Sequence, residues 1–161
     1  MFNLKAELYL KIIFLFSFIA LISAFFIEYI LGHQPCNLCL IERIPYIISI
    51  MIIMAIFLIK KNQKILVMLL ILTFMFSFTI SFYHFGIEQG FFQESSVCGV
   101  KSSTEIVTKE DLLKQLSEKT ISCKDVTFRI FGLSLTSINI VISLLFIITL
   151  LKIFNKYEKN K

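Results

Sequence analysis

Two cysteines separated by two residues, Cys36 and Cys39, stand at the beginning of a strongly apolar segment of the chain. Two thiols at this spacing can close into a disulfide and open again, which is a two-electron reaction. A second pair, Cys98 and Cys123, lies in the longest polar stretch of the sequence. Two cysteine pairs in a chain that is otherwise largely apolar predict that electrons pass between disulfides and into a lipid bilayer.

The residues after the first pair favour a reactive thiol. The apolar run that begins after Cys39 predicts a helix, and the dipole at a helix N-terminus favours a thiolate. Arg43 follows Cys39 by four residues, so the two share a helical face, and its permanent charge suits a thiolate or a reduced oxygen species. The alternative for Arg43 is an anchor at the membrane interface. Glu42 has the opposite charge but points about a quarter-turn aside.

The second pair is also compatible with a structural role or a metal site. A purely structural disulfide between Cys98 and Cys123 would close a long loop and contribute about 3–4 kcal/mol, but it would leave the first pair unexplained. A structural zinc site would need two closely spaced pairs. Only Cys36 and Cys39 are closely spaced, so we expect no metal.

Two more polar residues stand at the ends of apolar stretches. His84 follows Tyr83, and a histidine there is either an interface residue or a donor of a hydrogen bond or a proton to a bound oxidant. Glu28 is an acid inside an apolar stretch, which marks it for function by default. It is near enough to the predicted membrane surface to be solvated, and we assign it no role.

The elements that must position these residues are membrane helices. The chain has 161 residues, is 57% hydrophobic and has a mean hydropathy of +0.85, which is too apolar for a soluble domain. We expect one all-α membrane domain over residues 1–161, a bundle of four transmembrane helices at about residues 12–31, 40–59, 65–83 and 130–151. Each stretch approaches the length of about 20 residues that a helix needs to cross a bilayer. A cleaved signal peptide is the alternative for the first stretch, but its apolar run is too long and no clean cleavage site follows.

The distribution of Lys and Arg predicts the orientation. Both chain ends and the turn after the second stretch are rich in lysine, so both termini are expected in the cytoplasm. The loops at about residues 32–39 and 84–129 then face one outer compartment, where disulfides persist. The net charge of +5 is thus explained by anionic lipid on the inner face rather than by nucleic acid. No glycine-rich phosphate-binding motif occurs.

The long outer loop contains one predicted element. The run from Thr108 to Asp111 is similar to a capping box, and Leu112, Leu113 and Leu116 follow at helical spacing. We therefore expect a short amphipathic helix in the loop, either on the membrane surface or without membrane contact.

Three stretches resemble the bacterial disulfide bond formation protein B (DsbB) family. They are Pro35-Cys36-Asn37-Leu38-Cys39 with Glu42-Arg43, Tyr83-His84-Phe85-Gly86-Ile87-Glu88-Gln89-Gly90 leading to Cys98, and the run from Cys123 to Phe131-Gly132-Leu133-Ser134. The resemblance covers nearly the whole chain. It implies a four-helix protein of the bacterial inner membrane that reoxidises the periplasmic dithiol oxidase DsbA and passes electrons to a membrane quinone, either ubiquinone or menaquinone.

The resemblance also implies a role for each cysteine. Cys98 would form the mixed disulfide with the DsbA-like partner, and Cys123 would be its companion. Cys36 would exchange with this loop pair. Cys39 would be the thiolate that faces the quinone.

The same resemblance places Arg43 and His84 beside the quinone. The chain also departs from the family. It has no Trp, whereas relatives often carry Trp just after the last cysteine and at the fourth span, near Phe128 and Ile138 here. A proline that is common in relatives near the start of the fourth span is Thr136 in this chain.

The energetics favour a quinone as the final acceptor. DsbA is a strong oxidant with a reduction potential of about −120 mV, so only a stronger oxidant can keep it oxidised. Two alternatives remain. One is a sibling oxidase that serves a dedicated client, and the other is a membrane protein without enzymatic activity whose cysteines form static bonds or hold a metal.

Overall fold

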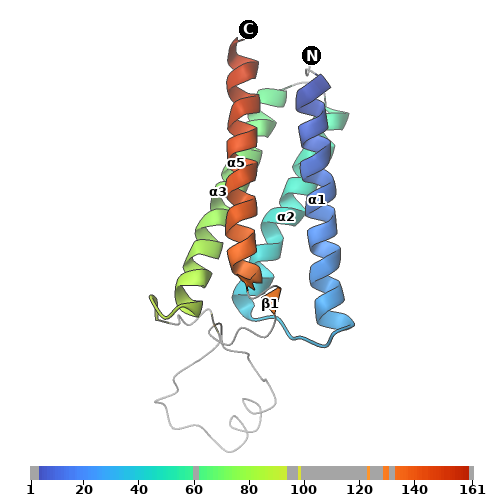
Figure 1. Cartoon of the computed structure of the whole chain (residues 1–161). Helices are drawn as coiled ribbons and strands as arrows, with labels where there is room; N and C mark the ends of the chain where they lie inside the picture. The colour runs from blue at the N-terminus through green and yellow to red at the C-terminus, as the bar shows by residue number, and fades with distance from the viewer. Residues whose placement is uncertain are drawn as a thin grey trace, which may run out of the picture.

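The fold is a bundle of four long helices that lie side by side (Figure 1). The structure, a computed structural model, describes residues 4–59, 62–93, 98, 123, 129–130 and 133–159. The elements in chain order are α1 (Leu4–Tyr29), α2 (Asn37–Leu58), α3 (Gln63–Glu88), β1 (Arg129–Ile130), β2 (Leu133–Ser134) and α5 (Leu135–Lys159). Helix α3 packs against α2 and α5, and α1 packs mainly against α2. Both chain ends lie at one end of the bundle, opposite β1 (Figure 1).

The predicted all-α bundle of four transmembrane helices is confirmed. Each of the four helices is long and apolar enough to cross a membrane, so this is a multi-pass membrane protein. The amphipathic helix predicted after Thr108 lies outside the described residues.

Several helix ends differ from the predicted bounds, and two of these differences lie next to the predicted site. The fourth helix begins at Leu135 rather than near residue 130, because β1 and β2 form a small antiparallel hairpin just before it. The Ser134 hydroxyl accepts the Ser137 N–H at 3.2 Å, which satisfies a free donor in the first turn of α5. Helix α3 continues to Glu88, beyond the predicted end at residue 83. His84 is therefore a helical residue rather than a loop residue.

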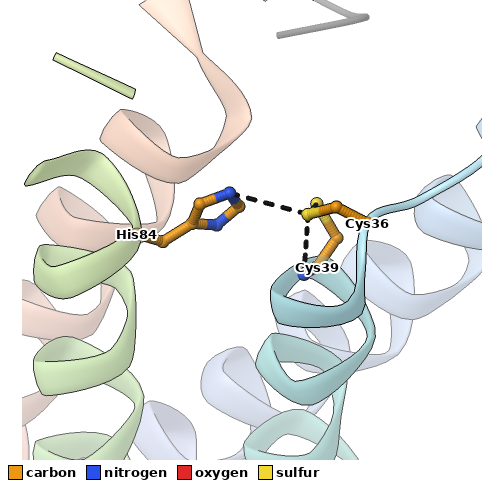
Figure 2. Close-up of side chains that lie close together, drawn as sticks. All are labelled: Cys36, Cys39 and His84. Carbon is orange, nitrogen blue, oxygen red and sulfur yellow. Dashed lines mark hydrogen bonds between the residues drawn. The ribbon is translucent and has the colours of Figure 1, made fainter. Parts of the chain in front are cut away.

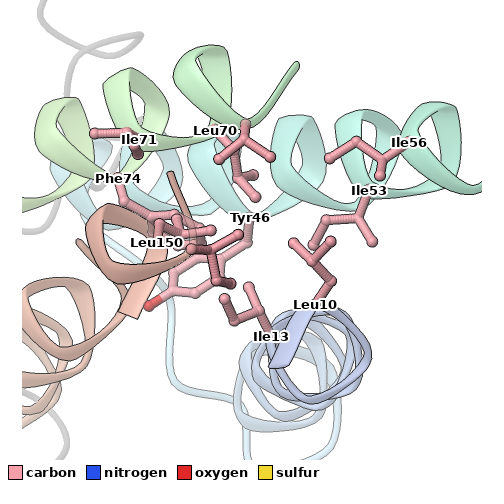
Figure 3. Packing of buried hydrophobic residues seen from close by; sticks show 11 residues of the cluster. Leu10, Ile13, Tyr46, Ile53, Ile56, Leu70, Ile71, Phe74 and Leu150 are labelled. Carbon is pink, nitrogen blue, oxygen red and sulfur yellow. The ribbon is translucent and has the colours of Figure 1, made fainter. Parts of the chain in front are cut away.

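The apolar core lies in the half of the bundle near the chain ends. All four helices contribute side chains to it (Figure 3): Leu10, Ile13, Tyr46, Ile53, Ile56, Val67, Leu70, Ile71, Phe74, Leu150 and Ile153. Phe74 is at its centre, with its ring edge-to-face against Phe146 at 5.0 Å and Tyr46 at 6.3 Å.

Small polar residues are buried between the helices, while large apolar residues face outward. Ser17 and Ser49 join α1 to α2 at 3.2 Å, and Ser77 and Ser143 join α3 to α5 at 3.2 Å. Lipid is as apolar as leucine, so helices in a bilayer associate through close packing and polar contacts rather than through apolar burial. The bundle therefore combines an apolar core with polar contacts between helices, and its outward apolar side chains suit lipid.

Helix α3 ends in a tight reversal of the chain. Gly90 adopts φ +78°, and its N–H donates to the Ile87 carbonyl at 3.0 Å while the Phe91 N–H donates to the Gly86 carbonyl at 2.8 Å. This is the Schellman arrangement, which requires a left-handed residue and therefore favours glycine. The ring of Phe92 then lies directly over Gly86, where a side-chain Cβ would overlap it.

Candidate functional site

The first cysteine pair lies at the N-terminus of α2. Cys36 is the N-cap residue, and its sulfur accepts the Cys39 backbone N–H at 3.3 Å. The two Sγ atoms are 2.8 Å apart with both cysteines free (Figure 2). The cap residue satisfies a free N–H at the positive end of the helix dipole, which is where a thiolate is most stable. The local fold of α2 thus prepares Cys36 for ionisation.

His84 reaches the same sulfur from α3. Its Nε2 atom lies 3.6 Å from Cys36 Sγ, and its side chain is only 3% exposed (Figure 2). These residues are 48 positions apart in the chain and meet because α2 and α3 are neighbours. A buried imidazole beside a thiol can accept its proton.

The pKa of the Cys36 thiol is lowered from 9.0 to about 4. The hydrogen bond from Cys39 is the largest cause, burial acts in the opposite direction, and the hydrogen bond and charge of His84 lower the pKa further. Cys36 is therefore a thiolate at neutral pH when the pair is reduced. The family resemblance implies that Cys39 is the thiolate facing the quinone, whereas in this arrangement the charge lies on Cys36.

A hydrogen-bond network continues from His84 into the bundle. His84 Nδ1 lies 2.9 Å from Glu42 Oε1, and the other oxygen of Glu42 accepts from Asn139 Nδ2 at 3.1 Å. Asn139 also donates to Ser81 Oγ at 2.7 Å and accepts from the Tyr46 hydroxyl. With the proton placed on Nδ1 toward the carboxylate, the Nε2 atom is left to exchange protons with Cys36.

Two further residues complete the surroundings of His84. The Thr136 hydroxyl of α5 donates to Glu88 Oε1 at 2.8 Å and lies 3.3 Å from His84 Nδ1. Glu88 Oε1 in turn lies 3.8 Å from His84 Nε2. Thr136 therefore supplies a hydroxyl to this network.

Arg43 lies on the opposite flank of the cysteine pair. Its Nη1 atom is 2.5 Å from Glu28 Oε2 of α1, and its guanidinium lies over the Phe25 ring at 5.2 Å. Both charged side chains are largely buried, at 14% and 21% exposed. The acid that we assigned no role is therefore the ion-pair partner of Arg43, and among the described residues Arg43 makes no hydrogen bond to the His84 network.

The second cysteine pair is joined as a disulfide and lies against the first. Cys98 and Cys123 are bonded with their Cα atoms 5.7 Å apart, across 25 positions of sequence. Both are buried in one apolar cluster with Cys36, Leu38 and Ile87, and Cys39 packs against it. All four predicted site cysteines are thus in one cluster at the end of the bundle opposite the chain termini.

The Cys36, Cys39 and His84 heteroatoms lie within 4.8 Å of one another, so this trio has the donor types of a metal site. Two thiolates on one tetrahedral zinc, with bonds of about 2.3 Å, would be about 3.8 Å apart. The two sulfurs are 2.8 Å apart. This arrangement suits exchange between thiol and disulfide better than it suits a metal.

Sequence reasoning did not assign roles to Glu42, Thr136 or Asn139. An available signal was the placement of polar residues inside apolar helices, since a buried polar group needs a partner. Glu42 and Tyr46 are four positions apart on α2, and Asn139 is a polar residue near the start of α5.

Comparisons with known proteins agree with this geometry. An uncharacterized protein of Rickettsia prowazekii (strain Madrid E) is 31% identical over 147 residues, which cover 90% of this chain and 86% of the relative. The family model described as disulfide bond formation protein DsbB matches residues 6–153, which include all four cysteines and all of the bundle except the first two residues of α1 and the last six of α5. The chain therefore belongs to the DsbB family of disulfide bond formation proteins.

Proposed function

We propose that this protein reoxidises a DsbA-like periplasmic dithiol oxidase by passing electrons through its two cysteine pairs to a membrane quinone. One observation carries the proposal. The Cys98–Cys123 disulfide and the Cys36–Cys39 pair lie in one buried cluster at one end of a membrane bundle. Thiol–disulfide exchange requires a thiolate to reach a disulfide sulfur, and this cluster provides both species side by side.

The electrons and protons balance over two exchanges. The client's two thiols lose two electrons and two protons as they form a disulfide, and Cys98 and Cys123 gain them as their bond opens. The reduced loop pair then forms its bond again while the Cys36–Cys39 disulfide is opened. The two electrons and two protons finally reside on the Cys36–Cys39 pair.

Cys36 is the sulfur of this pair that exchanges with the loop. It is in the same buried cluster as Cys98 and Cys123, and its lowered pKa makes it a good thiolate for attack and for departure. When a loop thiolate attacks Cys36, the leaving group is Cys39, which lies in the first turn of α2. The helix dipole stabilises the charge that Cys39 acquires at that moment. This reconciles the thiolate on Cys36 in the reduced pair with the role that the family implies for Cys39.

A quinone would supply the acceptor for two electrons and two protons. Arg43 and His84 are the residues that we propose to hold it, one on each flank of the pair. The donor set fits a quinone, because Arg43 offers guanidinium N–H groups and His84 has an Nε2 atom that faces the thiols. Arg43 is fixed by Glu28, so its charge is available without reorganisation.

The proposed location is the bacterial inner membrane with both termini in the cytoplasm. The end of the bundle that holds the chain termini also carries lysines such as Lys64, Lys152 and Lys156. The opposite end carries the cysteine cluster. Basic residues favour the cytoplasmic side, which supports a periplasmic position for the thiols.

The deciding experiment is a stopped-flow quinone spectrum of the purified protein mixed with a reduced DsbA-like partner. We expect the quinone to be reduced at a rate that depends on the partner concentration, and we expect Cys39→Ser to abolish this reduction. A lipid-facing variant, Thr73→Ala, is the control and should behave as wild type. If Cys39→Ser leaves the rate untouched, the assignment of Cys39 is wrong, and if the wild-type protein leaves the quinone oxidised, the proposed function is wrong.

The client is identified by trapping. In Cys123→Ser, the mixed disulfide at Cys98 has no companion to resolve it and should accumulate. Mass spectrometry of the trapped species then separates a general dithiol oxidase from a dedicated client. A protein whose cysteines are static would trap nothing, and its thiol count would not change when reduced partner is added.

A further inference from the structure

Two carboxylates flank the His84 imidazole, and they differ in how they are satisfied. Glu42 has a partner on each oxygen, namely His84 Nδ1 and Asn139 Nδ2. Glu88 accepts from Thr136 on Oε1, and only 6% of its side chain is exposed, but Oε2 has no hydrogen-bond partner among the described residues. An unsatisfied buried acceptor costs about 1–3 kcal/mol, so such an atom in a polar network calls for a physical reason.

The position of Glu88 suggests a reason why this oxygen is left unsatisfied. It lies one helical turn beyond His84 on α3, and it is followed by the exposed residues Gln89 and Gly90. The carboxyl group is thus between the imidazole and the outer end of the bundle. A proton that leaves the imidazole toward the aqueous surface meets Glu88 first.

The geometry at the imidazole supports the same direction of transfer. His84 Nδ1 is directed at Glu42, whereas Nε2 faces both Cys36 Sγ at 3.6 Å and Glu88 Oε1 at 3.8 Å. A single nitrogen atom therefore has the thiol on one side and the second carboxyl group on the other. Small movements bring either contact to hydrogen-bond distance, as in other sites that tighten during turnover.

We propose that Glu88 is the outer member of a proton path that runs from Cys36 Sγ through His84 Nε2 to the aqueous surface. The physiological use of the path rests on the proposed function, but the path itself serves any opening or closing of the Cys36 disulfide. In the reduced pair the proton of the Cys36 thiol already resides on His84 Nε2, and when the Cys36 thiolate forms an S–S bond this proton passes from Nε2 to Glu88. The electron pair remains on Cys36 Sγ for the attack, and the sulfur displaced from the attacked disulfide takes the pair of the broken bond. The same atoms return a proton when the Cys36 disulfide is opened.

Thr136 holds the outer member of the path in place. Its hydroxyl donates to Oε1, which leaves Oε2 as the oxygen that can take up or release a proton. The groups that face Glu88 from the packed elements are His84 of the same helix and Thr136 of α5, with Glu42 and Cys36 on the far side of the imidazole. A residue without a hydroxyl at position 136 would remove this contact.

The test uses full-length protein in detergent without quinone. The closed Cys36–Cys39 pair is reduced by dithiothreitol, the reaction is quenched by alkylation, and labelled Cys36 is counted by mass. We expect Glu88→Gln to slow this exchange by about tenfold, which is less than the about hundredfold or more of a direct acid–base group, because Glu88 acts through His84. We also expect a larger solvent deuterium isotope effect than in wild type. Thr136→Val should give a smaller change in the same direction, and Glu88→Asp should retain part of the rate.

Rescue by a small acid separates a proton path from a structural role. In Glu88→Ala, acetate should restore the exchange rate, whereas chloride at equal ionic strength should not. In Glu88→Gln, the amide fills the space and acetate should have no effect. The matched control is Glu7→Gln, the same chemical change on an exposed carboxylate paired with Lys11 in α1. It should exchange at the wild-type rate.

Two outcomes would overturn the proposal. One is a wild-type rate and isotope effect in Glu88→Gln. The other is a slow Glu88→Ala that keeps its thermal stability but is not restored by acetate. Because the assay contains no quinone, it is independent of the proposed function. Exchange that depends on Glu88 in a protein that never reduces quinone would retain the path and reject the function.

Discussion

The cysteine pair at the start of α2 has two polar flanks that are built differently. On the side of α3 and α5, His84 is linked to Glu42 and through it to Asn139 in a buried hydrogen-bond network. On the side of α1, a single ion pair joins Arg43 to Glu28 beside the Phe25 ring. A chain of hydrogen bonds can move protons, whereas an isolated ion pair provides a fixed charge. The flank of His84 can therefore move protons, while the flank of Arg43 provides a fixed positive charge.

The largest expected effect comes from removing the imidazole. In His84→Asn, Cys36 loses both the hydrogen bond and the charge that help to lower its pKa, so we expect that pKa to rise from about 4 toward 9.0. A rise of two pKa units would lower the thiolate fraction at acidic pH, and therefore the alkylation rate, by about a hundredfold. Alkylation of the reduced protein as a function of pH measures this. Arg43→Lys, on the other flank, should leave the profile unchanged, and a shift of similar size there would remove the distinction between the flanks.

The same pKa predicts how stability depends on pH. Because folding lowers the pKa of Cys36, its thiolate stabilises the reduced fold fully above the usual value of 9.0, and this contribution is lost as the pH falls to about 4. Thermal unfolding of the reduced wild type and of Cys36→Ser should therefore differ at neutral and alkaline pH and converge below about 4. A difference that persists unchanged in acid would argue against a thiolate on Cys36.

The next effect is on the stability of the network itself. Asn139→Leu removes the partner of Glu42 Oε2, Ser81 and the Tyr46 hydroxyl at once. We expect the free energy of unfolding to fall by about 2 kcal/mol, because buried polar groups would be left unpaired. Unfolding in mixed detergent micelles measures this loss. Ser77→Ala is the control, because it removes a polar contact to Ser143 between α3 and α5. Equal losses of stability in the two variants would mean that Asn139 acts only as a packing residue.

A smaller coupling is expected on the α1 flank. A double-mutant cycle of Glu28→Gln and Arg43→Gln should give a coupling energy of about 1 kcal/mol, since the cost of desolvating two largely buried charges offsets much of their attraction. Under the proposed function, Glu28→Gln should also raise the quinone KM severalfold without moving the alkylation profile of Cys36. Coupling of Glu28 to His84 instead of to Arg43 would contradict the separation of the two flanks.

The smallest effect is expected at a contact that belongs to neither flank. Ser17→Ala removes the hydrogen bond to Ser49, whose hydroxyl still donates to the Tyr46 carbonyl at 2.8 Å. Polar contacts between membrane helices average about 0.6 kcal/mol, so we expect a loss of that size or less. Detergent unfolding against wild type checks it, and a loss near that of Asn139→Leu would show that isolated contacts matter as much as the network.

The sequence predicted the bundle because lipid leaves a long apolar segment few alternatives to a helix. The Cys36–Cys39 pair was recognisable from its spacing, and Arg43 from its distance along the helix. The contact between Cys36 and His84 was not, because it depends on how α2 and α3 are rotated about their axes. The quarter-turn that sets Glu42 aside from Cys39 directs it toward His84, so a local electrostatic argument underrated it. The start of α5 was also missed, because hydropathy does not distinguish the β1–β2 hairpin from the apolar helix that follows it.

The reversal at the end of α3 has a consequence for the outer loop. Gly86 lets the Phe92 ring lie against the helix, and the Phe92 N–H donates to the Gly86 carbonyl at 3.2 Å. Cys98 follows Phe92 by six residues, and a chain of that length spans at most about 20 Å. A sulfur tethered within that radius has a high effective concentration near Cys36, so the proposed exchange would behave as an intramolecular reaction. Gly86→Ala would place a methyl group where the Phe92 ring now lies. It would therefore lower the effective concentration of Cys98 near Cys36 without changing either cysteine.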